Sequence, residues 1–425
     1  MDKKLEEKRG ILIFVDRESG SFEKGERKEF EEISWSAGWE ILGVVEARVK
    51  NPFYKYYLGR GKVEEIKSLL ESTPEVNFVL FNVEITPSQQ KNLEEIWQVP
   101  VYTKNALIHE IFAQRAHTAQ GKIKVELAQL RYQLSRLTGK GKDLSQTGGG
   151  IGTRGPGEQK IEVERRKIKD RIAHLNQELT KIEKQREVQR NLRRERNIPN
   201  VALVGYTNAG KSTLLNALTG SQVYVEKRMF ATLDPTTSKL FIPGVGETLF
   251  TDTVGFIREM PPTIKDAFRA TLEEIKDADL ILEVIDLSDK DYYLHFQIIN
   301  QLLEELEINN SPRILVFNKV DLLHSPLILE REIEENYTYT LVSAQKLTGL
   351  KELKEKISFF LQQEVKQLHL QVTYSQLPIV QKEIYHQGYI KELKTMKNGE
   401  IMIECIVRKE AAGKIRRLSQ VQVQV

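Results

Sequence analysis

The first 118 residues alternate between two kinds of hydrophobic pattern. Continuous apolar runs at residues 11–15 and 78–81 are typical of buried strands. Residues 88–98 instead carry apolar side chains at helical spacing. Because strand and helix signals follow one another in this way, the pattern predicts a small α/β domain over residues 1–118.

The pattern changes over residues 119–197, where two stretches repeat apolar residues with 4-3 spacing. The first stretch uses Ile123, Leu127, Leu130, Leu134 and Leu137, and the second uses Ile168, Ile172, Leu175, Leu179 and Ile182. Each repeat gives one apolar face on a helix. Between them, Gly139–Gly157 holds eight glycines in nineteen residues, a composition that predicts a loop and no helix. We therefore expect an antiparallel helical hairpin with residues 139–157 at its tip.

Residues 198–364 return to alternating strand and helix signals, with apolar strands at 201–204, 280–285 and 314–317. This alternation predicts a parallel-sheet α/β domain. Residues 365–425 show a strand near Leu370, a helix at 378–386 and a hairpin turn at Asn398-Gly399, which predict a small α+β domain. The expected fold class is therefore α/β, with a helical hairpin inserted and a smaller domain following.

Composition narrows the functional classes only slightly. The net charge of +3 excludes a uniformly basic chain, and the single Cys405 excludes an internal disulfide. The charged N-terminus lacks a signal-length apolar core, and no apolar run approaches the roughly 20 residues that span a bilayer. We expect a cytoplasmic, monomeric protein without a membrane span.

A phosphate-binding motif follows the strand at 201–204. The pattern GxxxxGK[ST] is matched by Gly205, Tyr206, Thr207, Asn208, Ala209, Gly210, Lys211 and Ser212. Glycines let the backbone N–H groups point at a phosphate, and the helix that follows adds partial positive charge. We expect Lys211 to reach the β- and γ-phosphates and Ser212 to ligate Mg²⁺.

A second motif selects the base. Asn318, Lys319, Val320 and Asp321 form NKxD directly after the strand at 314–317, at the edge of the sheet where such folds bind ligands. The Asp321 carboxylate can accept two hydrogen bonds from guanine N1 and N2, whereas adenine offers no such pair. A backbone contact to guanine O6 is expected from Ser343, Ala344 and Gln345. The expected nucleotides are GTP and GDP.

A third motif, DxxG, comprises Asp252, Thr253, Val254 and Gly255. We expect Asp252 to hold Mg²⁺ through water and the Gly255 N–H to sense the γ-phosphate. The preceding segment Phe230, Ala231, Thr232, Leu233 and Asp234 should close over the site. Spacing alone leaves Thr232, Thr236 and Thr237 as alternative Mg²⁺ ligands.

Two positions refine the expected chemistry. Phe256 stands where many signalling GTPases carry a water-positioning glutamine, so either hydrolysis is slow alone or another group supplies that contact. Asn208 occupies a place where an asparagine holds K⁺ beside the phosphates in some GTPases; the alternative is a turn-stabilising asparagine. We assign catalytic roles to Lys211, Thr232, Gly255 and Phe256.

The second helix of the predicted hairpin is basic. From Glu158 to Asn197 there are thirteen Lys or Arg against eight Asp or Glu. The tip carries Lys140, Lys142 and Arg154 against Asp143 alone. Such a surface suits phosphate backbones, and a glycine-rich tip can approach RNA closely. The alternative is a flexible linker beside a solvated helix.

The tip sequence, 146–158, closely resembles the signature loop of HflX-type GTPases. Similar motifs lie at 58–66, 85–90, 111–116 and 230–234, so the resemblance covers about residues 10–364. It implies binding to the large ribosomal subunit, with the hairpin near the peptidyl-transferase centre, and a role in splitting or rescuing ribosomes under stress. It also implies Thr232 as the Mg²⁺ threonine. Thr103-Lys104-Asn105 departs from the family's Asp-Arg-Thr.

Two rival hypotheses stay open at this stage. A GTPase with these motifs could act in ribosome assembly or on tRNA. A protein of another class would bind RNA and use GTP only as a structural ligand, although Lys211, Ser212, Asp252 and Gly255 together favour hydrolysis.

Overall fold

The computed structural model describes residues 8–16, 24–145, 156–195, 198–221, 229–230, 235–258, 260–265, 275–276, 278–305, 307–308, 311–323, 330–396 and 398–419. The chain forms two compact units. The first contains residues 1–181 with 227–233 and 259–269, and the second contains 182–226, 234–258 and 270–425. Two short segments from the middle of the sequence therefore pack with the N-terminal part of the chain.

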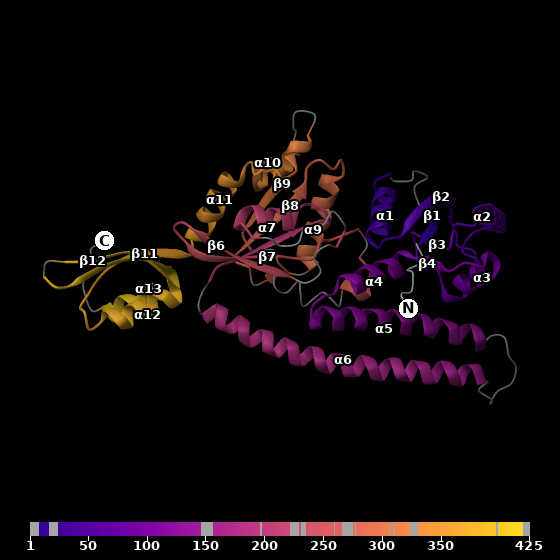
Figure 1. The fold of residues 1–425 in the computed structure, drawn as a ribbon, viewed down its shortest axis with the longest axis horizontal. Coiled ribbons are helices and arrows are strands. Elements are labelled where there is room, and N and C mark those ends of the chain that lie inside the picture. Colours follow the sequence, from indigo (N-terminus) through magenta and orange to yellow (C-terminus); the bar gives the residue numbers. More distant parts are fainter. Residues whose placement is uncertain are drawn as a thin grey trace, which may run out of the picture. The chain divides into compact units, whose positions relative to one another are not determined.

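A parallel four-stranded sheet forms the centre of the first unit (Figure 1). Its strands are β1 (Arg9–Asp16), β2 (Glu40–Arg48), β3 (Phe78–Phe81) and β4 (Val101–Thr103), in the order β2-β1-β3-β4. All four residues of β3 are buried, as expected for a continuous apolar run in a sheet that is covered on both faces.

Four helices accompany these strands: α1 (Lys24–Ser36), α2 (Arg60–Ser72), α3 (Pro87–Trp97) and α4 (Lys104–Arg115). Helix α3 begins with a capping box, in which the Thr86 hydroxyl accepts the Gln89 N–H and the Gln89 side chain accepts the Thr86 N–H. Pro87 fits the first turn because that turn needs no N–H donor from it.

Two long helices follow, α5 (Ala119–Ser145) and α6 (Pro156–Glu195), which run side by side in opposite directions (Figure 1). Arg171 donates two hydrogen bonds to the Glu126 carboxylate at 2.7 and 3.1 Å. Leu127 and Leu175 are buried. The predicted antiparallel hairpin is confirmed.

The predicted extent of the hairpin tip was wrong at both ends. Helix α5 continues through Gly139 and Gly141 to Ser145, and α6 already begins at Pro156. A glycine in a helix costs only about 1 kcal/mol relative to alanine, so two glycines near the end of a long helix do not stop it. The rest of the tip, 146–155, lies outside the described residues.

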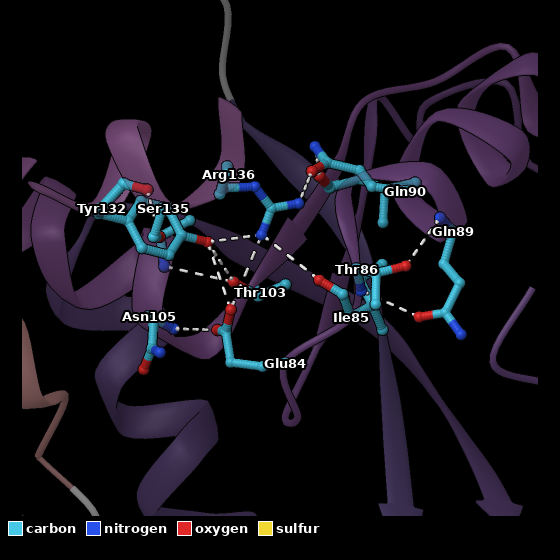
Figure 2. Close-up of polar contacts among 12 residues, drawn as sticks. Glu84, Ile85, Thr86, Gln89, Gln90, Thr103, Asn105, Tyr132, Ser135 and Arg136 are labelled. Atoms are coloured by element: carbon cyan, nitrogen blue, oxygen red, sulfur yellow. Dashed lines mark hydrogen bonds and ion pairs between the residues drawn. The ribbon is translucent and has the colours of Figure 1, made fainter. Parts of the chain in front are cut away.

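A polar cluster fastens α5 to the end of the N-terminal sheet (Figure 2). The Arg136 guanidinium donates to the Tyr132 hydroxyl at 3.0 Å and to the Ile85 carbonyl at 3.4 Å, and it also bonds the Gln90 side chain. The Tyr132 hydroxyl lies 3.4 Å from a Glu84 carboxylate oxygen. These contacts hold the second half of α5 against the loop that follows β3.

Two residues of the Thr103-Lys104-Asn105 segment belong to the same cluster (Figure 2). Thr103 is the N-cap of α4, and its hydroxyl accepts the Ala106 N–H at 3.5 Å. The Asn105 N–H donates to Glu84 at 3.3 Å. Because Thr and Asp both serve as N-caps, the threonine can begin this helix as the expected aspartate would.

The second unit contains a six-stranded sheet whose order is β10-β9-β8-β5-β7-β6. Its strands are β5 (Asn200–Gly205), β6 (Thr236–Ile242), β7 (Gly246–Asp252), β8 (Leu280–Asp286), β9 (Arg313–Asn318) and β10 (Thr338–Leu341). Only β6 among these strands is antiparallel to its neighbour, so β6 and β7 form a hairpin at one edge.

Helices α7 (Lys211–Thr219), α9 (Tyr292–Glu305), α10 (Arg331–Asn336) and α11 (Leu350–Gln362) connect these strands, with a 3₁₀ turn η1 at Val320–Leu322. The core between sheet and helices is apolar, with Leu214, Leu282 and Ile357 fully buried. Within the part of the chain that the structure describes, no helix combines the length and apolar character needed to cross a bilayer.

The C-terminal part forms a three-stranded antiparallel sheet in the order β11-β13-β12. Its elements are β11 (Val365–Val372), α12 (Leu377–Gln387), β12 (Gly388–Thr395), β13 (Ile401–Arg408) and α13 (Lys409–Ser419). Both helices contribute to the sheet's apolar core, where Cys405 is fully buried. The predicted hairpin turn is present, and Gly399 adopts φ +82°, which favours glycine.

Candidate guanine-nucleotide site

The three sequence motifs meet at one edge of the six-stranded sheet. Gly205 ends β5, Asp252 ends β7 and Asn318 ends β9, and these strands are parallel. Their carboxyl ends therefore face the same side, where open α/β sheets bind ligands.

The phosphate loop has no room for side chains at two of its glycines. A Cβ on Gly205 would lie 2.3 Å from the Val284 carbonyl oxygen, and one on Gly210 would lie 2.3 Å from the Asn318 side-chain nitrogen. Gly210 also has φ +93°. The loop can therefore curl tightly before the N-terminus of α7, which is a favourable place for a phosphate.

The Lys211 ammonium group is buried under the phosphate loop. It donates to the carbonyl oxygens of Gly205 and Tyr206 at 3.1 and 2.9 Å. Burial lowers the pKa of this amine to about 8, although the Asp252 carboxylate opposes the shift. Phosphate oxygens placed beside Lys211 would favour its charged form, so the site gains electrostatic attraction for a polyphosphate.

Ser212 and Asp252 make a compact pair of oxygen donors at the start of α7. The Ser212 hydroxyl donates to the Asp252 carboxylate at 2.6 Å, and Asp252 is fully buried. Hydroxyl and carboxylate oxygens are the ligand types that Mg²⁺ prefers, so both residues fit a metal beside the phosphates. The third residue assigned to the metal, Thr232, lies outside the described residues.

The DxxG segment lies directly against the phosphate loop. A Cβ on Gly255 would lie 2.9 Å from Thr207 Cα and 3.0 Å from the Lys211 Nζ. The Thr207 N–H donates to the Phe256 carbonyl at 2.8 Å, and the Phe256 N–H donates to the Gly205 carbonyl at 3.2 Å. A side chain at this position would therefore meet the phosphate loop and Lys211, which explains why glycine stands there.

The intervening residues of this motif pack inward. Val254 is buried, and the Thr253 hydroxyl donates to the Leu203 carbonyl at 2.7 Å. The Phe256 side chain is only 3% exposed. Phe256 is therefore a packing residue in this conformation, and its side chain offers no hydrogen bond to a water molecule.

The NKxD residues join the base region to the phosphate loop. The Asn318 amide donates to the Ala209 carbonyl at 2.9 Å and accepts the Ala344 N–H at 3.0 Å. Lys319, in a left-handed conformation, pairs with Asp286 at 2.7 Å. Val320 begins the turn η1 beside them.

Asp321 is oriented by a serine from the next loop. The Ser343 hydroxyl donates to the Asp321 carboxylate at 2.5 Å and accepts the Lys346 N–H at 3.0 Å. Ala344 is buried, whereas Gln345 is exposed. The Asp321 carboxylate is thus held in place by one of its two oxygens, and its contact with guanine stays a prediction.

Asp321→Asn should shift the preference from GTP towards xanthosine triphosphate. The side-chain amide of the Asp321→Asn variant can donate to the xanthine 2-oxo group. With guanine, that amide N–H would face the guanine N2 amino group, which is also a donor. Losing this pairing should weaken GTP binding by roughly 10- to 100-fold, as expected for about 1–3 kcal/mol. Competition titrations with GTP, xanthosine triphosphate and ATP measure the change. Equal binding of ATP and GTP by the wild-type protein would show that Asp321 does not select guanine.

The segment before DxxG is described only at its beginning. Ala231, Thr232, Leu233 and Asp234 lie outside the described residues. Phe230 belongs to the first unit, where its ring packs 4.7 Å from that of Phe112, and the Met229 N–H donates to the Ser36 hydroxyl at 2.8 Å. A direct contact between Phe230 and nucleotide stays a prediction.

The segment after DxxG also reaches the first unit. The Thr263 hydroxyl lies 3.1 Å from His109 Nε2, and burial lowers the pKa of His109 to about 4. His109 therefore stays neutral near pH 7. The segments on either side of β6 and β7 are thus both held by residues of the N-terminal fold.

Sequence reasoning missed a polar and aromatic cluster beside the phosphate loop. Tyr206 stacks on His295 of α9 with ring centroids 3.9 Å apart. The Tyr206 hydroxyl accepts the Arg258 N–H at 2.6 Å, and the Arg258 guanidinium pairs with Asp291 at 3.1 Å. The helical spacing of residues in α9 does not predict this stacking, because Tyr206 is far from His295 in the sequence.

The fold and this arrangement of motifs define a P-loop GTPase. Three family patterns match the chain in order: "GTP-binding GTPase N-terminal" over residues 24–113, "GTP-binding GTPase Middle Region" over 115–193, and "50S ribosome-binding GTPase" over 200–319.

Relatives with the name GTPase HflX match most of the chain. The protein from Caldanaerobacter subterraneus subsp. tengcongensis is 44% identical over 353 residues, which cover 83% of this chain and 80% of that protein. The Escherichia coli K12 protein is 42% identical over 342 residues, 80% of each chain. This chain belongs to the HflX family of GTPases. It hydrolyses GTP, and it binds GTP and GDP.

Among solved structures, a GTP-binding protein from Sulfolobus solfataricus in complex with GDP aligns with this chain. The alignment covers 84% of this chain and 99% of that chain, at 26% identity and a TM-score of 0.46.

Proposed function

We propose that this GTPase binds the large ribosomal subunit and acts in ribosome splitting, rescue or recycling, in particular under stress. The observation that carries the proposal is the combination of an intact GTPase site with the long hairpin α5–α6, whose second helix is strongly basic. The match of residues 200–319 to a family described as "50S ribosome-binding GTPase" supports the large subunit as the partner.

In the proposed reaction, water attacks the γ-phosphorus of GTP and GDP leaves with the bond electrons, giving GDP and phosphate. Backbone N–H groups of the phosphate loop hold the phosphates, and Lys211 balances the charge that develops on the transferred group. The Gly255 N–H would meet the γ-phosphate from the DxxG side. Mg²⁺ bound by Ser212 and Thr232, with Asp252 behind its water, would neutralise further phosphate charge.

We propose a K⁺ site beside Asn208 as an accessory to this chemistry. Asn208 is exposed at the turn of the phosphate loop and has φ +61°. Its side-chain oxygen is thus free to ligate a cation, although asparagine also suits this backbone conformation by itself. Hydrolysis should be faster in KCl than in NaCl at equal ionic strength, and Asn208→Ala should remove that difference. Equal wild-type rates in the two salts would refute the site.

The ribosomal assignment is tested by shortening the hairpin tip. Replacing residues 144–156 with a short glycine-serine turn should leave GTP affinity unchanged, because the phosphate-loop, DxxG and NKxD residues lie in the second unit. Binding to purified large subunits should weaken at least about tenfold if the tip approaches RNA as a glycine-rich loop can. Co-sedimentation with GTP, a non-hydrolysable analogue and GDP measures this. Unchanged binding would show that the tip is only a linker.

A further inference from the structure

The second unit contains a cavity of about 460 Å³ at the junction of the β6–β7 hairpin with the C-terminal sheet. Its apolar residues are Ile198, Pro199, Val245 and Val365. The other lining groups come from the end of α12 and from Arg408 in β13. None of the nucleotide motifs contributes to it, so the cavity needs a separate explanation.

Around the cavity, residues of the C-terminal sheet pack closely against the β6–β7 hairpin. The Tyr389 hydroxyl accepts the Gly244 N–H at 3.2 Å, and its ring packs against Phe241 with centroids 5.2 Å apart. A Cβ on Gly246 would lie 2.9 Å from the Tyr389 ring. Arg408 donates to both oxygens of Asp279 at 3.3 Å. The walls of the cavity are therefore held at a fixed separation.

The polar groups around the cavity are mostly basic. Lys239, Lys382, His386 and Arg408 line it, against the single carboxylate of Glu247. Glu247 pairs with Lys239, and Arg408 pairs with Asp279. Lys382 is exposed, and the part of the chain that the structure describes gives it no ion pair. The cavity thus presents at least one cation that is free to bind an anion.

An aromatic ring stands beside this cation. Tyr385 lines the cavity one helical turn from Lys382, since the two are three residues apart on α12, and it is 65% exposed. An exposed ring next to basic groups and an apolar surface is the combination with which proteins hold single-stranded nucleic acid, because a base stacks while its phosphate meets a cation.

The charge of the surrounding domain favours the same partner. Residues 365–425 contain ten Lys or Arg and five Glu, with no Asp, whereas the whole chain has a net charge of only +3. The C-terminal part, like residues 158–197, is therefore a basic portion of a nearly neutral protein. Such a concentration of positive charge attracts a phosphate backbone electrostatically.

We propose that this cavity, an open groove at the junction of the β6–β7 hairpin and α12, is a second RNA-binding site that takes a single-stranded segment. Tyr385 stacks on a base and Lys382 contacts the neighbouring phosphate. The inference extends the proposed function, since ribosomal RNA would supply the strand. It concerns a surface separate from the hairpin tip.

The test uses the full-length protein and a fluorescent single-stranded RNA of about ten nucleotides, within the range that one such groove contacts. Tyr385→Ala and Lys382→Ala should each raise the dissociation constant, about tenfold for the loss of one base stack. Lys382→Ala should also reduce the slope of log affinity against log salt by about 0.7. Photocrosslinking with 4-thiouridine RNA should label the α12 peptide that contains Tyr385.

Two control variants match these changes outside the groove. Tyr374 is 63% exposed, and Lys394 is an exposed lysine on β12, and neither lines the cavity. Tyr374→Ala and Lys394→Ala should bind the RNA as the wild type does. Groove variants with unchanged affinity and an unlabelled α12 peptide would overturn the proposal.

The outcome is separable from that of the proposed function. If wild-type protein binds large subunits but the groove variants bind RNA normally, only the groove assignment fails. If wild-type protein does not bind large subunits, the ribosomal function fails whatever the short RNA shows. Weakened subunit binding with normal RNA binding would indicate a protein partner and refute the RNA occupant.

Discussion

Large ribosomal subunits should raise the GTP turnover of this protein by roughly 10³- to 10⁵-fold, the range that partners in trans give other GTPases. The position after DxxG offers no water-positioning side chain, because Phe256 stands where many signalling GTPases carry glutamine and is only 3% exposed. Its backbone is also bonded to Gly205 and Thr207, which holds this segment against the phosphate loop. We therefore expect a surface outside the chain to order the attacking water or the segments around it.

Phosphate release measured with and without purified large subunits checks this expectation. Small subunits at equal concentration are the control for non-specific RNA effects. Linkage requires the reverse effect as well, so GTP should tighten subunit binding relative to GDP. A free enzyme that already turns over as fast as the stimulated one would contradict the role assigned to Phe256 and leave the ribosome as a binding partner only.

Lys211→Ala should lower GTP hydrolysis by at least about a hundredfold, because electrostatic stabilisation of the transferred phosphoryl group is lost in a buried site. The fold should survive the change. In the free protein burial lowers the pKa of this amine to about 8, so the desolvation of its charge outweighs the attraction of Asp252, and the net loss of stability on removal should be small.

Single-turnover hydrolysis and a thermal unfolding curve, measured on the same preparation, distinguish lost chemistry from lost structure. Lys351→Ala is a suitable control, since Lys351 is an exposed lysine on α11. Near-normal hydrolysis by the Lys211 variant would mean that another cation serves the phosphates. A variant that fails to fold would contradict the expectation about stability and is recognised by its unfolding curve.

The fold class followed from the sequence because its signals are local. Apolar runs predicted the strands β3, β5 and β9, and the 4-3 spacing predicted the helices α5 and α6. Motif spacing then predicted where Lys211 and Asp252 would meet, since parallel strands end on one side of their sheet. A strand that is buried on both faces is encoded as a continuous apolar run, and a helix with one apolar face is encoded as a periodic apolar pattern.

Other parts of the site depend on contacts that no local sequence pattern predicts. The Asn318 amide joins the phosphate loop to Ala344, although NKxD suggests only a base contact. The stacking of Tyr206 on His295 joins residues that are nearly ninety positions apart. Such pairs are set by how helices pack on the sheet, which hydrophobic periodicity predicts only as a face and not as a partner.

The limits of the hairpin tip could not be read from composition either. Glycine content predicted a loop from Gly139, yet α5 continues to Ser145. A long helix that is already anchored by packing and by Arg136 gains a hydrogen bond for each added residue, which offsets the glycine penalty. A glycine-rich composition indicates that a segment prefers a loop. The stability of the preceding helix α5 determines at which residue the loop begins.

The burial of Cys405 in the C-terminal core gives the protein an internal reporter of local opening. It is the only thiol in the sequence, it is fully buried, and burial raises its pKa to about 12. An alkylating reagent reacts with thiolate, so it can modify this residue only when the C-terminal sheet opens. The rate of labelling therefore measures the stability of that one sheet within the intact chain, without any added probe.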